Sequence, residues 1–262
     1  MRKRESYVVS LSIIASFLIV APAFAVEPWV AYTSFDNIYD MNAPNPWVAG
    51  DWTITGTSGG AWTASGTSLD YSDTHNAEME FGLWNAGGAN PVGASTTWTY
   101  EVNARVNANG PEAGGTWPPA GLWIGIMNQA DELSELVIRT DSVQLRKSDG
   151  TWATAAVAVD SNFHTIRMVR DSDGSVKVYR DQTDNQGGPI LVSDTVNDNE
   201  PSYTDASVVC FGDIAFQGGA DDGLDAEINY LAFDLDNAYA PEPATMILLA
   251  AGSLACILRK RR

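Results

Sequence analysis

Two groups of closely spaced carboxylates are the residues of this sequence best suited to chemistry. Glu78 and Glu80 stand two apart, so a strand would place both on one face, as the acid and nucleophile of glycoside hydrolysis require. The stretch GGADDGLDAE, residues 218–227, offers the oxygen ligands that Ca²⁺ prefers. A solvated acidic loop is the favoured interpretation of this stretch, and a Ca²⁺ site is the alternative. The candidate ligands are Asp221, Asp222, Asp225 and Glu227.

Histidine and cysteine, the other residues that commonly perform chemistry, are scarce. His75 and His164 are isolated from one another, so they predict neither a zinc site nor a catalytic triad. Cys210 lies in the apolar stretch VVCF and is predicted to be a small core residue. The stretch DSDGS, residues 171–175, begins like a calcium loop but lacks the twelfth-position acid, which favours a simple turn. No cofactor is therefore expected, with Ca²⁺ as the one candidate.

All 9 tryptophans lie between Trp29 and Trp152. Trp117, in GGTWPPAG, stands in a loop stiffened by two prolines, where a flat ring could stack on a sugar. Trp84 and Trp62 have similar glycine-rich surroundings and are further glycan-binding candidates. The alternative role for all three is to cover the edges of the core. Trp98 and Trp123 occur in strand patterns and are predicted to be core residues.

A β-framework must position these residues. The stretch TWTYEVNARV alternates: Trp98, Tyr100, Val102, Ala104 and Val106 share one face, and Thr97, Thr99, Glu101, Asn103 and Arg105 share the other. This period of two predicts a half-buried strand. Further strands are predicted in 121–127, on both sides of Thr140-Asp141, in a hairpin over 163–181, and in 206–216 and 226–236. No helical period occurs between Val26 and Ala240, which favours an antiparallel sandwich.

The first 25 residues have the pattern of a secretory signal peptide. MRKRE provides a positive start, residues 7–20 are mostly apolar, and Ala23-Phe24-Ala25 is a small-x-small cleavage site. We expect cleavage after Ala25 and export of the remaining chain across the inner membrane.

The last 22 residues, PEPATMILLAAGSLACILRKRR, form a second segment that combines an apolar run with a basic end. Ala244–Leu258 is an uncharged run of 15 residues, and as a helix it would rise about 22 Å. That length is short for a bilayer core of about 30 Å, so it predicts a short transmembrane helix and a weak anchor. The four cations that follow would remain in the cytoplasm, which disfavours the alternative of a buried core helix.

The PEP turn, the short apolar helix and the basic tail together resemble the PEP-CTERM sorting signal. The resemblance implies an exosortase-like membrane protease as partner, with Pro241, Glu242 and Pro243 as the residues that it recognises. It also implies a bacterium that makes exopolysaccharide, and a precursor held only transiently in the inner membrane. Residues 234–240, DLDNAYA, are predicted to end the last strand and form a short linker, so that cleavage there would release the domain intact.

The three segments predicted so far are residues 1–25, 26–240 and 241–262. Removal of the two ends takes away 7 cations and 2 anions from the chain's 15 and 33. The body keeps 8 cations and 31 anions, a net charge of −23. Such a surface repels nucleic acid and anionic lipid, so neither is an expected partner.

The order of the body's strands resembles the concanavalin A-like lectin/glucanase superfamily, in its laminin-G-like branch. The resemblance rests on Phe163–Arg167, on Val176–Asp181, and on the glycine-rich loop Gly218–Gly223 before a last strand. It implies an all-β jelly roll of two antiparallel sheets, here with an N-terminal signal helix and a C-terminal transmembrane helix. Enzymes of the superfamily carry a Glu-x-Asp-x-x-Glu strand, and the stretch around Glu78 lacks its third carboxylate. Glu132 and Glu135 would face opposite sides of a strand.

These observations predict an exported, non-enzymatic protein of the cell surface or exopolysaccharide matrix that could bind polysaccharide. A glycoside hydrolase of the same fold is one alternative hypothesis. A structural matrix protein without a ligand is the other. The sequence does not choose between the first hypothesis and the last.

Overall fold

The computed structural model describes most of the body and leaves gaps between the ordered elements. The described residues are 31–41, 51–56, 62–64, 68–72, 80–85, 91–93, 96–109, 120–129, 133–157, 162–181, 189–193, 207–213 and 224–239. Contacts divide the chain into one unit of residues 30–240 and another of residues 1–29 with 241–262. The predicted signal helix and transmembrane helix belong to the second unit and lie outside the described residues. Nowhere in the described ranges is there a helix with the length and apolar character that crossing a membrane requires.

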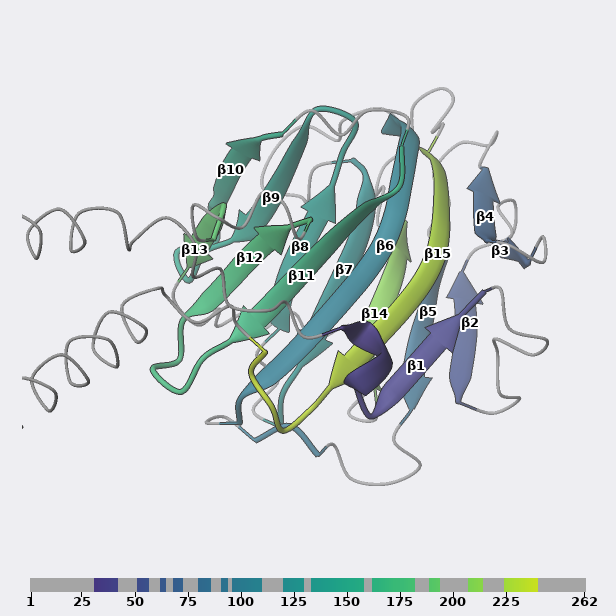
Figure 1. Cartoon of the computed structure of the whole chain (residues 1–262). Coiled ribbons are helices and arrows are strands. Elements are labelled where there is room, and N and C mark those ends of the chain that lie inside the picture. The colour runs from purple at the N-terminus through teal and green to yellow at the C-terminus, as the bar shows by residue number, and fades with distance from the viewer. Residues whose placement is uncertain are drawn as a thin grey trace, which may run out of the picture. The chain divides into compact units, whose positions relative to one another are not determined.

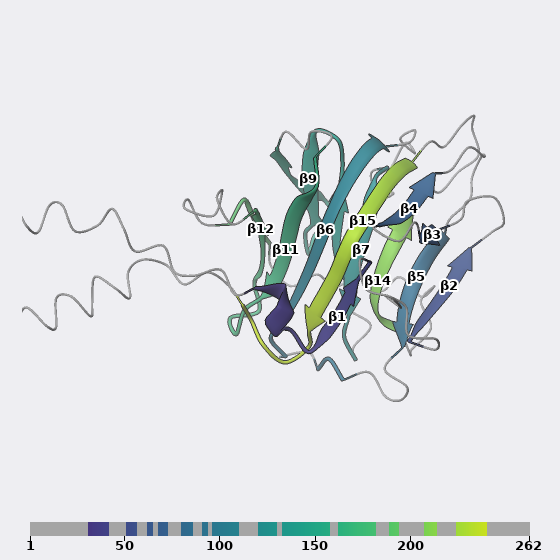
Figure 2. The same ribbon diagram turned by 45° about the vertical axis from the view of Figure 1, so that its right-hand side comes forward.

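Two antiparallel sheets form the described structure, as Figures 1 and 2 show. In the eight-stranded sheet the strands follow the order β13-β12-β11-β6-β15-β4-β3, and β1 pairs with β15 beside this path. Their bounds are β13 Leu191–Ser193, β12 Val176–Arg180, β11 His164–Arg170, β6 Trp98–Asn109, β15 Leu224–Asp234, β4 Leu69–Ser72, β3 Trp62–Ala64 and β1 Asn37–Asp40. A short 3₁₀ turn, η2, covers Tyr32–Ser34.

The seven-stranded sheet packs behind the first in the order β10-β9-β8-β7-β14-β5-β2. Its bounds are β10 Trp152–Ala156, β9 Ser142–Arg146, β8 Leu133–Ile138, β7 Leu122–Met127, β14 Ser207–Asp213, β5 Glu80–Asn85 and β2 Trp52–Gly56. The predicted all-β jelly-roll sandwich is therefore confirmed.

Every strand predicted from residue 98 onward is present. The hairpin over 163–181 closes through Asp171–Ser175, where Gly174 adopts φ +85° and its amide donates to the Asp171 carbonyl at 2.9 Å. This confirms the predicted turn. The sequence did not reveal β1 to β5, β10 or β13. It also gave no sign of the 3₁₀ turn over Tyr32–Ser34.

The alternation of β6 builds one wall of the core. Its inward residues Trp98, Tyr100, Val102, Ala104 and Val106 all belong to the main buried cluster, as predicted. Burial of this apolar surface away from water is the main contribution that holds the two sheets together.

Strand β7 is buried on both faces, which explains its uninterrupted apolar sequence. Leu122, Ile124 and Ile126 face the main core. Trp123 and Met127 belong to a second buried cluster with residues from β8 and β14. Trp123 is 1% exposed. Its predicted role as a core residue is therefore confirmed, and it belongs to this second cluster.

A β-bulge in β15 changes which residues face outward. The register with β6 shifts between Ile228 and Tyr230. Ile228 belongs to the core, and so do Leu231 and Phe233 beyond the bulge. Asn229 and Tyr230 therefore both point to the outer face, since the extra residue reverses the alternation.

The outer face of the eight-stranded sheet is not uniformly exposed, which corrects the prediction of a half-buried β6. Thr99 and Glu101 were assigned to the polar side of the strand, yet they are 0% and 1% exposed. Arg167 on β11 pairs with Glu101 at 2.5 Å and is also fully buried. Burial lowers the pKa of Arg167, and the charge of Glu101 opposes that shift.

Aromatic side chains from the two ends of the body cover this ion pair. Tyr32 stacks on Tyr230 with ring centroids 3.9 Å apart, and Phe35 stacks on Tyr239 at 5.0 Å. The Arg167 guanidinium lies 5.2 Å from the centroid of the Phe35 ring. We call Tyr32, Phe35, Tyr230, Ala232 and Tyr239 the terminal cluster.

The segment predicted as a linker is part of this cluster. The Tyr239 amide donates to Thr99 Oγ1 at 2.8 Å, and the Tyr239 carbonyl accepts from Arg167 Nη1 at 3.1 Å. The short linker predicted after the last strand, within residues 234–240, is thus wrong as far as Tyr239, because the buried guanidinium uses that carbonyl as an acceptor.

We predict that Arg167→Met destabilises the domain by about 3–5 kcal/mol, because it leaves the buried Glu101 carboxylate without its cation. For a domain of this size the midpoint of thermal unfolding would fall by roughly 6–20 °C. Glu101→Gln combined with Arg167→Met should recover part of the loss. Thermal unfolding followed by circular dichroism measures both effects.

Arg105→Met is the matched control, because Arg105 and Glu227 form the same kind of cross-strand pair on the same sheet face. Their side chains are 33% and 18% exposed, so the loss should stay below about 1 kcal/mol. Equal losses in the two variants would contradict the importance of burial.

Candidate functional site

Most residues singled out from the sequence lie outside the described part of the chain. Trp62 in β3 and Glu80 in β5 have described backbones, but their side chains are not described. The other predicted residues without a described position are Ala23, Ala25, His75, Glu78, Trp117, Glu132, Asp221, Asp222, Pro241, Glu242 and Pro243. Their roles remain predictions.

Trp84 lies at the edge of the core. Its ring meets Phe233 edge-on, with centroids 4.9 Å apart and planes at 72°. Its Nε1 donates to the Tyr39 hydroxyl at 2.8 Å, and that hydroxyl in turn donates to Asp51 at 3.2 Å. Burial raises the pKa of Tyr39 to about 12, so this hydroxyl keeps its proton at neutral pH. These contacts fit the core-covering alternative for Trp84.

A group of polar side chains occupies the outer face of the eight-stranded sheet beside the terminal cluster, which it meets where Thr165 Oγ1 lies 3.4 Å from the Tyr230 hydroxyl. We call it the open polar array. It comprises Asn103, Arg105, Asn107, Thr165, Asp225, Glu227 and Asn229, from strands β6, β11 and β15. Asn107 is exposed and the other six are half-buried.

The carboxylates of β15 anchor one side of the array. Arg105 binds Glu227 through two hydrogen bonds, from Nε at 2.8 Å and from Nη2 at 2.6 Å. The Asn107 amide donates to Asp225 at 3.0 Å and to Glu227 at 3.3 Å. Asp225, predicted as a calcium ligand, is thus engaged by a neighbouring strand on the sheet face.

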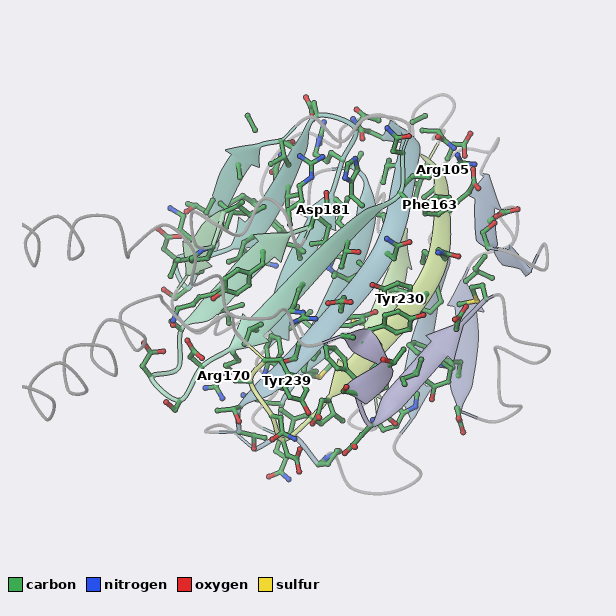
Figure 3. All side chains as sticks on the ribbon, viewed as in Figure 1. Arg105, Phe163, Arg170, Asp181, Tyr230 and Tyr239 are labelled. Carbon is green, nitrogen blue, oxygen red and sulfur yellow. The ribbon has the colours of Figure 1, made fainter. Side chains whose placement is uncertain are left out.

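Amide and hydroxyl groups continue the array toward β11. Asn229 donates to Asn103 Oδ1 at 3.1 Å, and Asn103 donates to Thr165 Oγ1 at 3.1 Å. The Arg105 guanidinium also lies over the Phe163 ring, 4.8 Å from its centroid. Figure 3 shows Arg105 and Phe163 together, away from Tyr239 on the same sheet.

Two residues at the open end of the β11–β12 hairpin fix the edge of this surface. His164 begins β11, and Asp181 directly follows β12. His164 Nδ1 lies 2.6 Å from Asp181 Oδ2, and the Thr165 amide donates to Asp181 Oδ1 at 2.8 Å. Asp181 has φ +42°, an uncommon conformation that its two side-chain contacts help to hold. His164, for which the sequence predicted a structural role, thereby clamps the open end of the β11–β12 hairpin.

Cys210 has the features of an inert core residue. It is 4% exposed, and its thiol donates to the Gly125 carbonyl at 3.3 Å. Burial and the nearby Glu135 raise the pKa of the Cys210 thiol. The thiol therefore stays protonated and is unsuited to nucleophilic chemistry.

A group of carboxylates that the sequence did not single out could hold a cation. Ligand oxygens of Asp36, Asp234 and Asp236 all lie within 4.8 Å of one another. Asp234 is 1% exposed, and it already accepts hydrogen bonds from Asn237 at 3.1 Å and from the Tyr239 hydroxyl at 2.9 Å. These contacts make Asp234 primarily the acceptor that organises the turn after β15.

Asp234 and Asp236 interact within this turn, and their pKa values shift in opposite directions. Burial works to raise the pKa of Asp234, but hydrogen bonds from Asp236, Tyr239 and Asn237 outweigh it and lower the pKa. The pKa of Asp236 is raised, because Asp236 contacts Asp234 and the charge of Asp234 disfavours a second negative charge beside it. A cation bound here would have to compete with the protein donors of Asp234.

Sequence reasoning found only part of the open polar array. The period of β6 correctly placed Asn103 and Arg105 on the polar side, and Asp225 and Glu227 drew attention as acids. Nothing in the sequence indicated that β6 pairs with both β11 and β15. The paired residues of these strands are more than 50 positions apart in the sequence.

We predict at most a modest effect of Ca²⁺ on stability. At ten times its dissociation constant, a ligand of one site adds about 1.4 kcal/mol, a rise in melting temperature of roughly 3–6 °C. The measurement is differential scanning calorimetry with Ca²⁺ and then with a chelator. Asp236→Asn tests one of the two exposed members of the trio. A melting temperature that collapses on chelation and returns with Ca²⁺ would show an essential site.

Comparison with solved structures finds similar folds at low sequence identity. A glycosyl hydrolase family 16 protein from Mycobacterium smegmatis is 16% identical with a TM-score of 0.43, over 76% of this chain and all of the other. A Bacillus subtilis protein of unknown function with a galectin-like fold is 15% identical with a TM-score of 0.47, over 77% and 96%. The Emp47p carbohydrate recognition domain is 12% identical with a TM-score of 0.46, over 76% and 95%.

These similarities concern the fold alone and assign no activity. No curated protein matches the chain. The PEP-CTERM protein-sorting motif matches residues 240–262, in agreement with the resemblance found in the sequence. The chain therefore carries a PEP-CTERM motif, which indicates an exosortase-sorted protein of the surface or extracellular space.

Proposed function

We propose that this protein is exported, held transiently in the inner membrane, and released by an exosortase-like protease as a non-enzymatic polysaccharide-binding domain. The open polar array is the proposed contact surface. The observation that carries the proposal is the mutual hydrogen bonding of its side chains beside Phe163, which fixes several donors and acceptors on one sheet face.

Such a surface matches the chemistry of a sugar. Each hydroxyl of a sugar can donate and accept, and the array offers amide, hydroxyl, carboxylate and guanidinium groups. Asn103, Asn107 and Glu227 are already held by their neighbours, so binding would cost less conformational entropy than with mobile side chains. Phe163 adds an aromatic surface beside these groups.

The charge of the body favours neutral polysaccharides. The body has a net charge of −23, from 8 cations and 31 anions. Among the described residues, six of the cations form ion pairs with carboxylates: Arg105, Arg139, Arg146, Arg167, Lys177 and Arg180. A polyuronate would meet this acidic surface with few cations available to attract it.

A glycoside hydrolase remains the alternative, and one observation favours it. Asp225 and Glu227 stand two apart on β15 and share the Asn107 amide, so their carboxylates lie side by side. Against catalysis, both oxygens of Glu227 are bound by Arg105. A catalytic carboxylate needs an oxygen available to the substrate.

The decisive measurement is a glycan array with the mature protein purified from producing cells. We predict that it binds neutral glycans in preference to polyuronates. Asn107→Ala should weaken binding about 2- to 10-fold, through the loss of one polar contact. Thr154→Ala is the matched control, because Thr154 is exposed on β10 in the other sheet and should bind normally.

Other results of this experiment would reject the proposal in distinct ways. No binding to any glycan would favour a structural matrix protein. Preference for polyuronates would refute the charge argument. Binding lost in Trp117→Ala but unchanged in Asn107→Ala would move the site to the Trp117 loop.

We also predict no release of reducing sugar from laminarin, lichenan or related polymers. Hydrolysis that disappears in Glu227→Gln would establish the enzyme alternative at the array. Hydrolysis that disappears in Glu78→Gln or Glu80→Gln would instead establish the carboxylate pair suggested by the sequence. A reducing-sugar assay on each purified variant distinguishes these outcomes.

A further inference from the structure

We infer that removal of the sorting tail cuts the chain on the C-terminal side of Tyr239, so that the mature protein keeps residues 235–239 as a docked strap. This inference goes beyond polysaccharide binding and concerns the site of processing. It rests on the sorting part of the proposed function, and one of its tests needs no sorting enzyme.

The backbone of the strap is bound along β6. Thr97 Oγ1 donates to the Asp236 carbonyl at 3.0 Å, and Thr99 Oγ1 donates to the Asn237 carbonyl at 2.9 Å. The Tyr239 amide donates to Thr99 Oγ1 at 2.8 Å, and its carbonyl accepts from Arg167 Nη1 at 3.1 Å. A protease that binds its substrate as an extended chain needs these backbone groups for itself, so it must first detach the strap.

Side chains hold the strap from both sides. The Tyr239 hydroxyl donates to Asp234 at 2.9 Å, and the Tyr239 ring stacks on Phe35 from the N-terminal segment. Figure 3 shows Tyr239 past the end of β15, on the sheet face that also carries Tyr230. The strap can therefore detach only when the terminal cluster opens.

The anchored residues end close to the sorting motif. Pro241 stands two residues after Tyr239 in the sequence, and the motif matches from residue 240. The first peptide bond beyond the anchored residues is the one that joins Tyr239 to Ala240. Hydrolysis at or beyond this bond breaks one amide C–N bond with one water, leaving a carboxylate on the body and an ammonium group on the tail.

The first test is the intact mass and C-terminal peptide of the mature protein from producing cells. A C-terminus at Tyr239 or later supports the inference, and a C-terminus within residues 235–238 or earlier overturns it. Recovery of only the full chain to Arg262, in cells with an active sorting enzyme, would refute the sorting on which this test rests.

The second test is independent of sorting and uses limited proteolysis of the full chain in detergent with a non-specific protease. In the wild-type protein the core fragment should retain Tyr239. Phe35→Ala removes one ring of the stack, and cleavage within residues 235–239 should become roughly 3- to 10-fold faster. Ile38→Ala is the control from the same segment, because the Ile38 side chain is 40% exposed.

Thr99→Val is a second variant that preserves the shape of the side chain. It removes the hydroxyl bound to Asn237 and Tyr239 and should also speed cleavage of the strap. Melting temperatures near that of the wild type would verify that both variants fold. Equal cleavage rates within the strap in wild type, Phe35→Ala and Thr99→Val would overturn the inference.

Discussion

The buried ion pair between Arg167 and Glu101 is the constraint on which the outer architecture depends. Two charges removed from water need further partners. Glu101 also accepts a hydrogen bond from the Tyr230 hydroxyl at 2.6 Å, and Arg167 uses the Tyr239 carbonyl at 3.1 Å and lies against the Phe35 ring. Burial and the charge of Glu101 raise the pKa of Tyr230, so this donor keeps its proton. Both ends of the domain are therefore required to complete one buried polar network.

The bulge in β15 divides the same sheet face into two regions with different roles. Before it, Asp225 and Glu227 point outward into the open polar array, which Asn229 joins from the bulge itself. At the bulge, Tyr230 also turns outward and meets Glu101. One extra residue thus separates a water-accessible polar surface from a covered one that holds the two ends of the body. The two cross-strand pairs, Arg105 with Glu227 and Arg167 with Glu101, have the same chemistry and differ in burial.

The few cations of this acidic body serve mainly to bind its own carboxylates. Arg146 pairs with Glu135 at 3.0 Å in the seven-stranded sheet. Lys177 pairs with Asp171 across the hairpin turn. Most of the described cations are therefore paired with the protein's own carboxylates, and the acids that remain give the body a negative charge that repels polyanions. The proposed preference for neutral polysaccharides follows from this distribution.

The sequence by itself determined what depends on local pattern. The period of two around Tyr100, the turn at Gly174 and the PEP motif at Pro241 can each be recognised from neighbouring residues. The tertiary structure alone decided which polar positions are covered. Glu101 and Arg105 are both outward residues of one strand, yet Glu101 is buried and Arg105 is not, because segments more than 60 residues away in the sequence pack over only one end of the sheet. Burial of an outward side chain depends on such distant segments, and a period along one strand contains no information about them.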